Sequence, residues 1–306
     1  MIQFVVSGAL PSFPALRSRC LADPDALLNI ADRIGAPSSS AADLSDRFSL
    51  ILHDLRIGGV WKRTNRGRLK RTEEMVCAHI HPDLRAGLTF LDLGASDGIT
   101  TVEAVQTLRQ AFGSEVRAFL TDLNLWLFRY RRGPIVEYRA GNGEPVMARL
   151  GFFGIRLARQ RREAPPESNP LVRLYLRQNR FRQSMELDAR ISLVHPAARS
   201  DPGITIMELD CLAGDRSLKD RIGAIRASNV LNLGYFPLPE LRRAVGHLHS
   251  YLRDGGCLVI SRNNDESACD TENGSVWLRK DRCFHWRQDF GSGSEIKSIV
   301  DGWSLS

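Results

Sequence analysis

An apolar segment that runs directly into a turn of small residues constrains the fold of this chain most strongly. Residues 88–98 read Leu-Thr-Phe-Leu-Asp-Leu-Gly-Ala-Ser-Asp-Gly. The first part is typical of a buried strand, and Asp92 stands near its carboxyl end. Gly94, Ser96 and Gly98 follow at alternate positions, where the backbone comes close to a ligand. The segment therefore predicts a strand and a turn that cradles a nucleotide-like cofactor.

The residues after this turn predict a helix. Thr100 and Glu103 have the spacing of a capping box, and Gly113 can end the helix. Apolar residues repeat between them with a helical period: Val102, Val105, Leu108 and Phe112. A strand, a turn and a helix in this order form the first unit of an open α/β sheet.

Later segments repeat the pattern of an apolar strand that ends in a polar side chain. Further strands are expected at 116–122, 204–211, 222–229 and 257–261, with an amphipathic helix at 239–253 before the last. Asp122, Asp210 and Asn229 stand at the carboxyl ends of three of them. Because ligands of open α/β sheets bind at the carboxyl ends of the strands, these side chains and Asp92 are expected to meet at one edge.

The segment Asp92-x-Gly94-x-Ser96-x-Gly98 resembles the first motif of class I S-adenosylmethionine-dependent methyltransferases, with Ser in place of the middle Gly. Asp122 and Asp210 stand where the second and third motifs of this family meet the ribose and the adenine. A dinucleotide dehydrogenase would instead need Gly at the position of Ile99. The resemblance implies an α/β fold, with a doubly wound, Rossmann-like, seven-stranded methyltransferase sheet that ends in an antiparallel hairpin.

The resemblance also implies S-adenosylmethionine as the cofactor. The residues that it places at the cofactor are Asp92, Gly94, Ala95, Ser96, Gly98, Asp122, Leu123, Asp210, Cys211 and Asn229.

Two parts of the chain lie outside this pattern. Residues 1–87 are expected to form a mostly helical N-terminal cap, and residues 88–306 the methyltransferase domain. Asp122 and Asp210 are 88 positions apart, where the minimal fold needs roughly 20 to 30 residues. Residues 129–203 are therefore expected to form an inserted α+β subdomain that acts as a lid or substrate platform.

The net charge of +7 is concentrated in the expected insertion. Residues 129–199 contain 15 arginines, no lysine and six acids, a net charge of +9, which leaves −2 for the rest of the chain. This surplus favours an anionic or phosphate-bearing acceptor, either a small molecule or a lipid. A nucleic-acid-binding protein with a methyltransferase-like fold is an alternative, but the few aromatic residues among these arginines argue against it. Residues 151–162 suggest peripheral membrane contact as a third reading.

The chemistry of methyl transfer requires alignment more than acid–base catalysis, because a sulfonium is already an activated donor. Asn232 and Tyr235 follow the strand at 222–229 and are expected to face the acceptor, with Tyr235 as a catalytic candidate. This segment loosely resembles one in chemotaxis-receptor glutamate methyltransferases, which keeps a protein carboxyl methyltransferase as an alternative. His195 is the candidate base, because it follows a strand and has a near-neutral ordinary pKa.

Several other classes of protein are not predicted. The six cysteines have no metal-binding spacing, and the sequence contains no His-Glu-x-x-His, phosphate-binding Gly-Lys-Ser/Thr or Gly-x-Ser-x-Gly motif. No metal is therefore expected. The chain has no apolar run of about 18 residues and no basic leader before its first apolar stretch. These features predict a cytoplasmic protein with reduced thiols.

Overall fold

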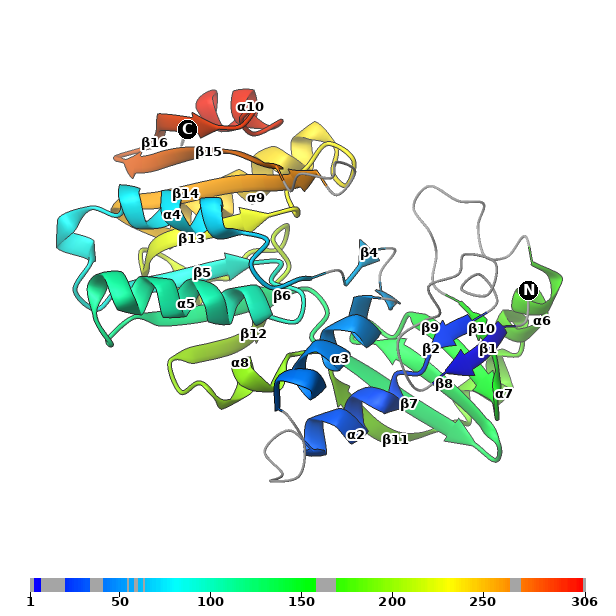
Figure 1. The fold of residues 1–306 in the computed structure, drawn as a ribbon. Coiled ribbons are helices and arrows are strands. Elements are labelled where there is room, and N and C mark those ends of the chain that lie inside the picture. Colours follow the sequence, from blue (N-terminus) through cyan, green and yellow to red (C-terminus); the bar gives the residue numbers. More distant parts are fainter. Residues whose placement is uncertain are drawn as a thin grey trace. The chain divides into compact units, whose positions relative to one another are not determined.

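The computed structural model describes residues 3–6, 20–33, 41–53, 55–57, 60–62, 64–157, 169–264 and 271–304. The chain divides into two compact units. Unit 1 lies within residues 1–64 and 124–196, and unit 2 within residues 65–123 and 197–306. Each unit contains one seven-stranded sheet (Figure 1).

Unit 2 is a doubly wound α/β sheet, as the sequence predicts. Its strands are β5 (Thr89–Leu93), β6 (Arg117–Asp122), β12 (Ile204–Glu208), β13 (Ile222–Ser228), β14 (Leu252–Asn264), β15 (Thr271–Lys280) and β16 (Cys283–Phe290). They lie in the order β12-β6-β5-β13-β14-β15-β16. The first five are parallel, and β15 and β16 add the expected antiparallel hairpin. Chain order reverses between β5 and β13, which is the topological switch point of a Rossmann-like sheet.

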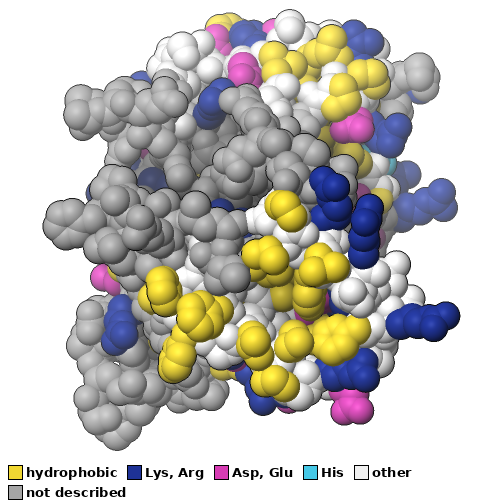
Figure 2. All heavy atoms as spheres, turned by 90° about the vertical axis from the view of Figure 1, so that its right-hand side faces the viewer, with side chains coloured by type: hydrophobic (Ala, Val, Ile, Leu, Met, Phe, Trp, Pro, Cys, Tyr) yellow, Lys and Arg dark blue, Asp and Glu magenta, His cyan; other side chains and the backbone are white. Residues whose placement is uncertain are grey.

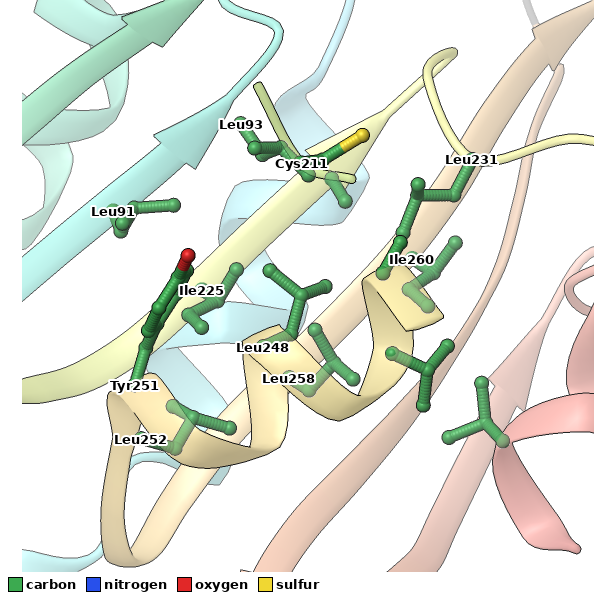
Figure 3. Packing of buried hydrophobic residues seen from close by; sticks show 14 of the residues in the cluster. Leu91, Leu93, Cys211, Ile225, Leu231, Leu248, Tyr251, Leu252, Leu258 and Ile260 are labelled. Atoms are coloured by element: carbon green, nitrogen blue, oxygen red, sulfur yellow. The ribbon is translucent and has the colours of Figure 1, made fainter. Parts of the chain in front are cut away.

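Helices cover both faces of this sheet. They are α4 (Lys70–His79), α5 (Ile99–Phe112), α9 (Leu238–Tyr251) and α10 (Lys297–Asp301), with single turns at η1 (Pro82–Leu84) and η3 (Arg216–Leu218) and the short α8 (Pro196–Ser200) at the boundary between units. Alternate residues of a strand point to opposite faces. Leu91 of β5 accordingly joins the core under α9, where Leu248 packs with Ile225 and Leu258 (Figure 3). Asp92 points to the other face, toward Thr101 of α5.

Unit 1 is built on a largely antiparallel sheet. Its strands lie in the order β11 (Glu186–Ser192), β7 (Trp126–Arg132), β8 (Ile135–Ala140), β9 (Pro145–Leu150), β10 (Phe153–Arg156), β1 (Gln3–Val6) and β2 (Cys20–Ala22). The other elements are α2 (Asp25–Arg33), α3 (Ala41–His53), α6 (Pro170–Arg177), α7 (Asn179–Gln183) and a small ladder of β3 (Arg56–Ile57) and β4 (Val60–Trp61). A separate core joins α2 and α3 to the sheet through residues such as Leu27, Phe48 and Tyr138.

This division differs from the expected domain boundaries at residues 87, 129 and 203. The N-terminal segment is not a separate helical cap, because β1 pairs with β10 and extends the sheet of the expected insertion. Val5 N–H, for example, donates to the Phe152 carbonyl at 2.9 Å. In addition, α4 belongs to unit 2. Among the described helices, none is long and apolar enough to cross a membrane.

Candidate functional site

The turn between β5 and α5 has the backbone that the sequence predicts. Gly94, Ser96 and Gly98 have φ angles of +69°, +60° and +81°, so three alternate residues adopt the left-handed region. This conformation is uncommon for a residue other than glycine, which makes Ser96 notable. Gly98 is also the N-cap residue of α5. The turn therefore lies at the carboxyl edge of the sheet, directly beside the switch point.

Neighbouring side chains of unit 2 fill the space that a Cβ atom at Gly94 or Gly98 would occupy. A Cβ atom on Gly94 would lie 2.0 Å from Cγ2 of Val230, which follows β13. A Cβ atom on Gly98 would lie 2.0 Å from Cδ1 of Leu120 in β6. Glycine was expected here to let a ligand approach the backbone. In the structure, close packing of the turn on β13 and of α5 on β6 requires glycine at both positions.

Asp122 reaches this turn from the end of β6. Its Oδ2 atom accepts a hydrogen bond from the Ser96 backbone N–H at 2.9 Å. Asp122 is half-buried, whereas the next residue, Leu123, exposes 58% of its surface. A carboxylate and an exposed apolar side chain thus lie together at the edge of the sheet. The structure therefore brings together three residues of the predicted cofactor set: Ser96, Asp122 and Leu123.

The ends of β13 and β14 supply amides and hydroxyls at the same edge. Asn229 has a φ of +61°, and its Oδ1 atom accepts the Asn263 backbone N–H at 2.9 Å. The hydroxyl oxygens of Ser228 and Ser261 lie 2.7 Å apart. The sequence pattern predicts Asn229 as a site residue but not Asn263. The signal was present, because polar residues replace apolar ones in the strand after Ile260.

The segment before α4 is also held at this edge. The Gly67 backbone N–H donates to the Glu103 carboxylate, at 2.9 Å to Oε2, and the Arg68 carbonyl accepts from Asn263 Nδ2 at 2.6 Å. Glu272 of β15 accepts from the backbone N–H groups of Arg71 and Thr72, each at 2.8 Å. These bonds fix the residues from Gly67 to Thr72 to α5 and to the carboxyl end of β14.

Asp92 has a different role from the one expected. It is 2% exposed, and its carboxylate accepts from Arg226 at 2.5 and 2.9 Å and from the Thr101 hydroxyl at 2.6 Å. Arg226 is fully buried in β13 and also contacts Glu73 at 3.3 Å. Both oxygens of Asp92 therefore bind groups of the protein. The residue supports the turn from within the core and does not present its carboxylate to a cofactor.

Burial changes the titration of Glu73 in this cluster. Removal from water raises its pKa from the ordinary 4.5 to about 7, although the positive charge of Arg226 opposes the shift. A hydrogen bond from the Thr107 hydroxyl at 3.3 Å also favours the ionised form. The buried Arg226 of β13 thus pairs with two carboxyl groups, those of Glu73 in α4 and Asp92 in β5.

Asp210 and Cys211 lie beyond the end of β12. The exposed Asp210 folds back on its own turn, where Oδ1 accepts the Leu212 backbone N–H at 2.8 Å. Cys211 is 8% exposed and belongs to the core under α9 (Figure 3). Burial raises the pKa of this thiol to about 11. The Cys211 side chain therefore packs inward and is not exposed at the carboxyl edge of the sheet.

The acceptor candidates Asn232 and Tyr235 lie in the turn after β13. The Asn232 carbonyl accepts the backbone N–H groups of Tyr235 and Phe236, each at 3.1 Å. Tyr235 is 36% exposed, and the neighbouring Leu233 is 52% exposed. The turn therefore follows Asn229 directly and presents an aromatic and an aliphatic side chain to the surface of unit 2.

His195 lies in unit 1 and is buried. It is 1% exposed, and its ring contacts Phe48 edge-on with the ring centroids 5.4 Å apart. The sequence places a polar residue after a strand, but Leu193 and Val194 continue into the core after β11 ends. His195 follows them inward, so its ring packs in the core of unit 1, whereas the sequence suggested a base that faces the cleft.

Acids of unit 1 neutralise part of its arginine surplus. Arg129 and Arg149 pair with Asp25 at 3.0 and 2.5 Å, and Arg182 pairs with the fully buried Glu137 at 2.7 Å. Burial alone would raise the pKa of Glu137, but hydrogen bonds from Arg182 and its neighbours hold that pKa below its ordinary value. Several of these arginines therefore stabilise unit 1 and are not available to an anionic ligand.

Two buried oxygen atoms at the carboxyl edge have no hydrogen-bond partner in the described part of the chain. They are Oγ of Ser96 and Oδ1 of Asn263, in residues that are each 7% exposed. A buried polar atom without a partner is costly, so it points to a ligand or to ordered water. Carboxylate, hydroxyl and amide groups beside an apolar residue fit an adenosine-bearing molecule. Among the described residues, no cluster of His, Cys, Asp and Glu could hold a metal ion.

Neither a family model nor a curated protein matches this sequence. Among solved structures, the chain is similar to the CMeT domain of the citrinin polyketide synthase, with 15% identity and a TM-score of 0.32 over 77% of this chain and 42% of that one. It is similar to the DszA carbon methyltransferase, with 15% identity and a TM-score of 0.31 over 78% and 48% of the two chains.

A third similar structure is the N-methyltransferase NodS from Bradyrhizobium japonicum WM9, in complex with S-adenosyl-L-homocysteine. Here the identity is 13% and the TM-score 0.31, over 66% of each chain. The chain spans less than half the length of the first two structures. All three structures are described as methyltransferases or methyltransferase domains.

Proposed function

We propose that this chain is an S-adenosylmethionine-dependent methyltransferase that acts on a small-molecule acceptor. One observation carries the proposal. At the switch point of the unit 2 sheet, the turn with Ser96 meets the Asp122 carboxylate, and the unpartnered oxygens of Ser96 and Asn263 lie in residues of the same edge. Ligands of open α/β sheets bind at this location.

The proposed roles follow from the chemistry of each group. Asp122 holds ribose hydroxyls, because an ionised carboxylate accepts hydrogen bonds from vicinal hydroxyl groups. Leu123 covers one face of the adenine with its exposed apolar side chain. Asn229, Asn263 and the turn at Ser96 orient the remainder of the cofactor. Asp92 is a positioning residue, since it fixes β5 to β13 through Arg226.

Bound S-adenosylmethionine supplies an electrophilic methyl group on a sulfonium. The residues of the chain then have to align the acceptor atom with that carbon and exclude water. Alignment alone can supply about 7 to 11 kcal/mol of the barrier. Asn232 and Tyr235 are proposed to orient the acceptor from the turn after β13. The proposal assigns no general base, and His195 has no part in it because its ring is buried in unit 1.

The arginines weigh against the nucleic-acid-binding alternative. Arg129, Arg149 and Arg182 are ion-paired within unit 1, so they contribute little to counterion release on a nucleic acid. Among the described residues, no specific contact favours a protein carboxylate as the acceptor. A small molecule is therefore the acceptor that we propose.

Isothermal titration with S-adenosylmethionine and S-adenosylhomocysteine tests the cofactor. We expect both to bind the parent protein, and Asp122→Asn to weaken binding by about tenfold or more, which corresponds to about 1.4 kcal/mol. Asp83→Asn is the matched control, because Asp83 is an exposed carboxylate that precedes β5, at the amino edge of the sheet. If the parent protein gives no heat with either compound, the proposal is wrong. Once binding is established, a methyl-label screen of cell extract would identify the acceptor.

A further inference from the structure

Unit 1 carries an aromatic cluster at the turn between β9 and β10. Phe152 is 79% exposed, and Leu150, Phe153 and Phe4 are 51%, 53% and 54% exposed. Phe153 pairs with Leu150 across the hairpin and with Phe4 across the β1 junction. The rings of Phe4 and Phe153 have centroids 5.6 Å apart. These four residues, called here the aromatic tip, are exposed apolar side chains in and beside this turn.

Helix α6 adds a second group of exposed apolar side chains. Its buried Val172 packs with Ala148 and Leu157, so this side of the helix faces β9 and the end of β10. Leu171 and Leu174 remain 46% and 59% exposed. Besides the side that packs on the sheet, the helix therefore also exposes two leucines. Figure 2 shows hydrophobic side chains gathered on the side of the molecule where Figure 1 has β1, β10 and α6.

The surrounding charge is positive. The described ranges 145–157 and 169–185 contain six arginines and no acidic residue. Two of these arginines are held in ion pairs with acids of other segments. Arg173, Arg177 and Arg180 are exposed on α6 and α7. Figure 2 shows Lys and Arg side chains along the border of the apolar group.

We propose that the aromatic tip, Leu171 and Leu174 dock unit 1 on an anionic lipid surface. Protruding phenylalanines insert into the boundary between headgroups and acyl chains, while nearby arginines meet lipid phosphates. Contiguous exposed apolar patches with a polar border mark sites of protein or membrane interaction. The inference is independent of the proposed methyl transfer, because it uses residues of unit 1 alone.

The charge distribution favours a lipid surface over a second copy of the chain. In a twofold dimer the same patch meets itself, so the arginines of one protomer would approach those of the other. Like charges at an interface oppose association. An anionic bilayer, in contrast, complements both the apolar centre and the basic border of this surface.

Co-sedimentation with vesicles tests this proposal on the full chain. Vesicles of phosphatidylcholine alone are compared with vesicles that also contain phosphatidylglycerol. We expect binding to the anionic vesicles only, and a loss of about tenfold or more in apparent affinity for Phe152→Glu. The double variant Arg177→Glu/Arg180→Glu should bind more weakly and lose much of the salt dependence of the parent. Leu187→Glu is the matched control, because Leu187 is 58% exposed on β11, the opposite edge strand of the same sheet.

Circular dichroism first establishes that each variant is folded. Failure of the parent protein to sediment with anionic vesicles, or equal sedimentation of Phe152→Glu and the parent, overturns the proposal. Light scattering after size exclusion tests whether a second copy of the chain, and not a lipid surface, covers this patch. A parent dimer that Phe152→Glu converts to a monomer would assign this surface to self-association and would also overturn the lipid proposal.

Discussion

At the scale of single residues, Arg226 is the most consequential side chain in unit 2. It is fully buried in the middle of β13, where it binds Asp92 and Glu73. A buried charge is tolerated only when partners compensate for the loss of water. The three side chains come from β13, β5 and α4, so this cluster joins two strands and a helix directly behind the candidate site.

Replacing Arg226 should destabilise the protein strongly. Arg226→Met keeps much of the volume but leaves two carboxyl groups buried without their cation, for which we expect a loss of about 3 to 5 kcal/mol in the free energy of unfolding. Arg242→Met on the exposed side of α9 should change it by less than about 0.5 kcal/mol. Urea titration measures both. Equal midpoints for the two variants would show that the buried cluster contributes nothing to stability.

Glu73 should make stability depend on pH. Its folded pKa of about 7 lies above its ordinary 4.5, so the folded state binds more protons between these values. The stabilisation that comes from the protonated form is complete below about pH 4.5 and is lost as pH rises through about 7. Glu73→Gln should remove this part of the pH dependence, on the order of 3 kcal/mol at most. Glu74→Gln is the exposed neighbouring control. Urea titrations across this pH range would contradict the assignment if both variants kept the slope of the parent.

At the scale of elements, the turn between β5 and α5 is a packing junction as much as a ligand loop. A Cβ atom on Gly94 would clash with Val230, which follows β13, and one on Gly98 would clash with Leu120 of β6. The turn is thereby fixed to the strands on both sides of β5. Such a junction holds the Ser96 N–H against Asp122 before any ligand is bound. We expect this edge to be preorganised in the free protein.

A double-mutant cycle tests this junction. Gly94→Ala adds both the strain of a positive φ and a clash with Val230, and we expect it to cost about 2 to 5 kcal/mol. Gly113→Ala is the matched control, because Gly113 also has a positive φ but no atom lies near its added Cβ. Val230→Ala should recover part of the loss in Gly94→Ala and none of the loss in Gly113→Ala. Thermal unfolding measures the stability of the parent, of the three single variants and of the two double variants with Val230→Ala. The absence of coupling between positions 94 and 230 would show that the contact does not constrain the turn.

At the scale of the whole molecule, each unit has its own hydrophobic core. The core of unit 1 contains Phe48, Leu52 and Tyr138, and the core of unit 2 contains Leu248, Tyr251 and Trp277. Separate cores behave as separate cooperative units in native-state hydrogen exchange. A mutation in the core of one unit should therefore change the stability of that unit and leave the stability of the other unchanged.

Phe48→Ala should loosen unit 1 selectively. Phe48 is fully buried, and we expect its truncation to cost about 3 to 5 kcal/mol in that unit. Hydrogen exchange followed by mass spectrometry should show faster exchange in β7, β8 and β11, and unchanged exchange in β5, β13 and β14. Leu50→Ala is the control on the same helix, because Leu50 is 46% exposed. Equal acceleration in both units would show that they unfold together.

The order of elements in unit 2 could be predicted from the sequence because its signals are local. An apolar strand, a small-residue turn and a periodic helix lie within residues 88–113, and Asp122 ends the next strand. The placement of Asp122 beside Ser96 follows from parallel pairing of consecutive strands. These features depend on neighbours in the sequence, so they are visible without coordinates.

Only the tertiary structure decided which distant segments meet. The pairing of β1 with β10 joins residues that are 149 and 151 positions apart, and short strands give no signal for such a partner. The same holds for Asp92, whose cation lies in β13, and for His195, whose ring turns toward Phe48. A sequence pattern encodes the periodicity of an element but not the charge or surface against which it packs. Long-range pairing therefore divided the chain into its two units and buried residues that the sequence assigned to a site.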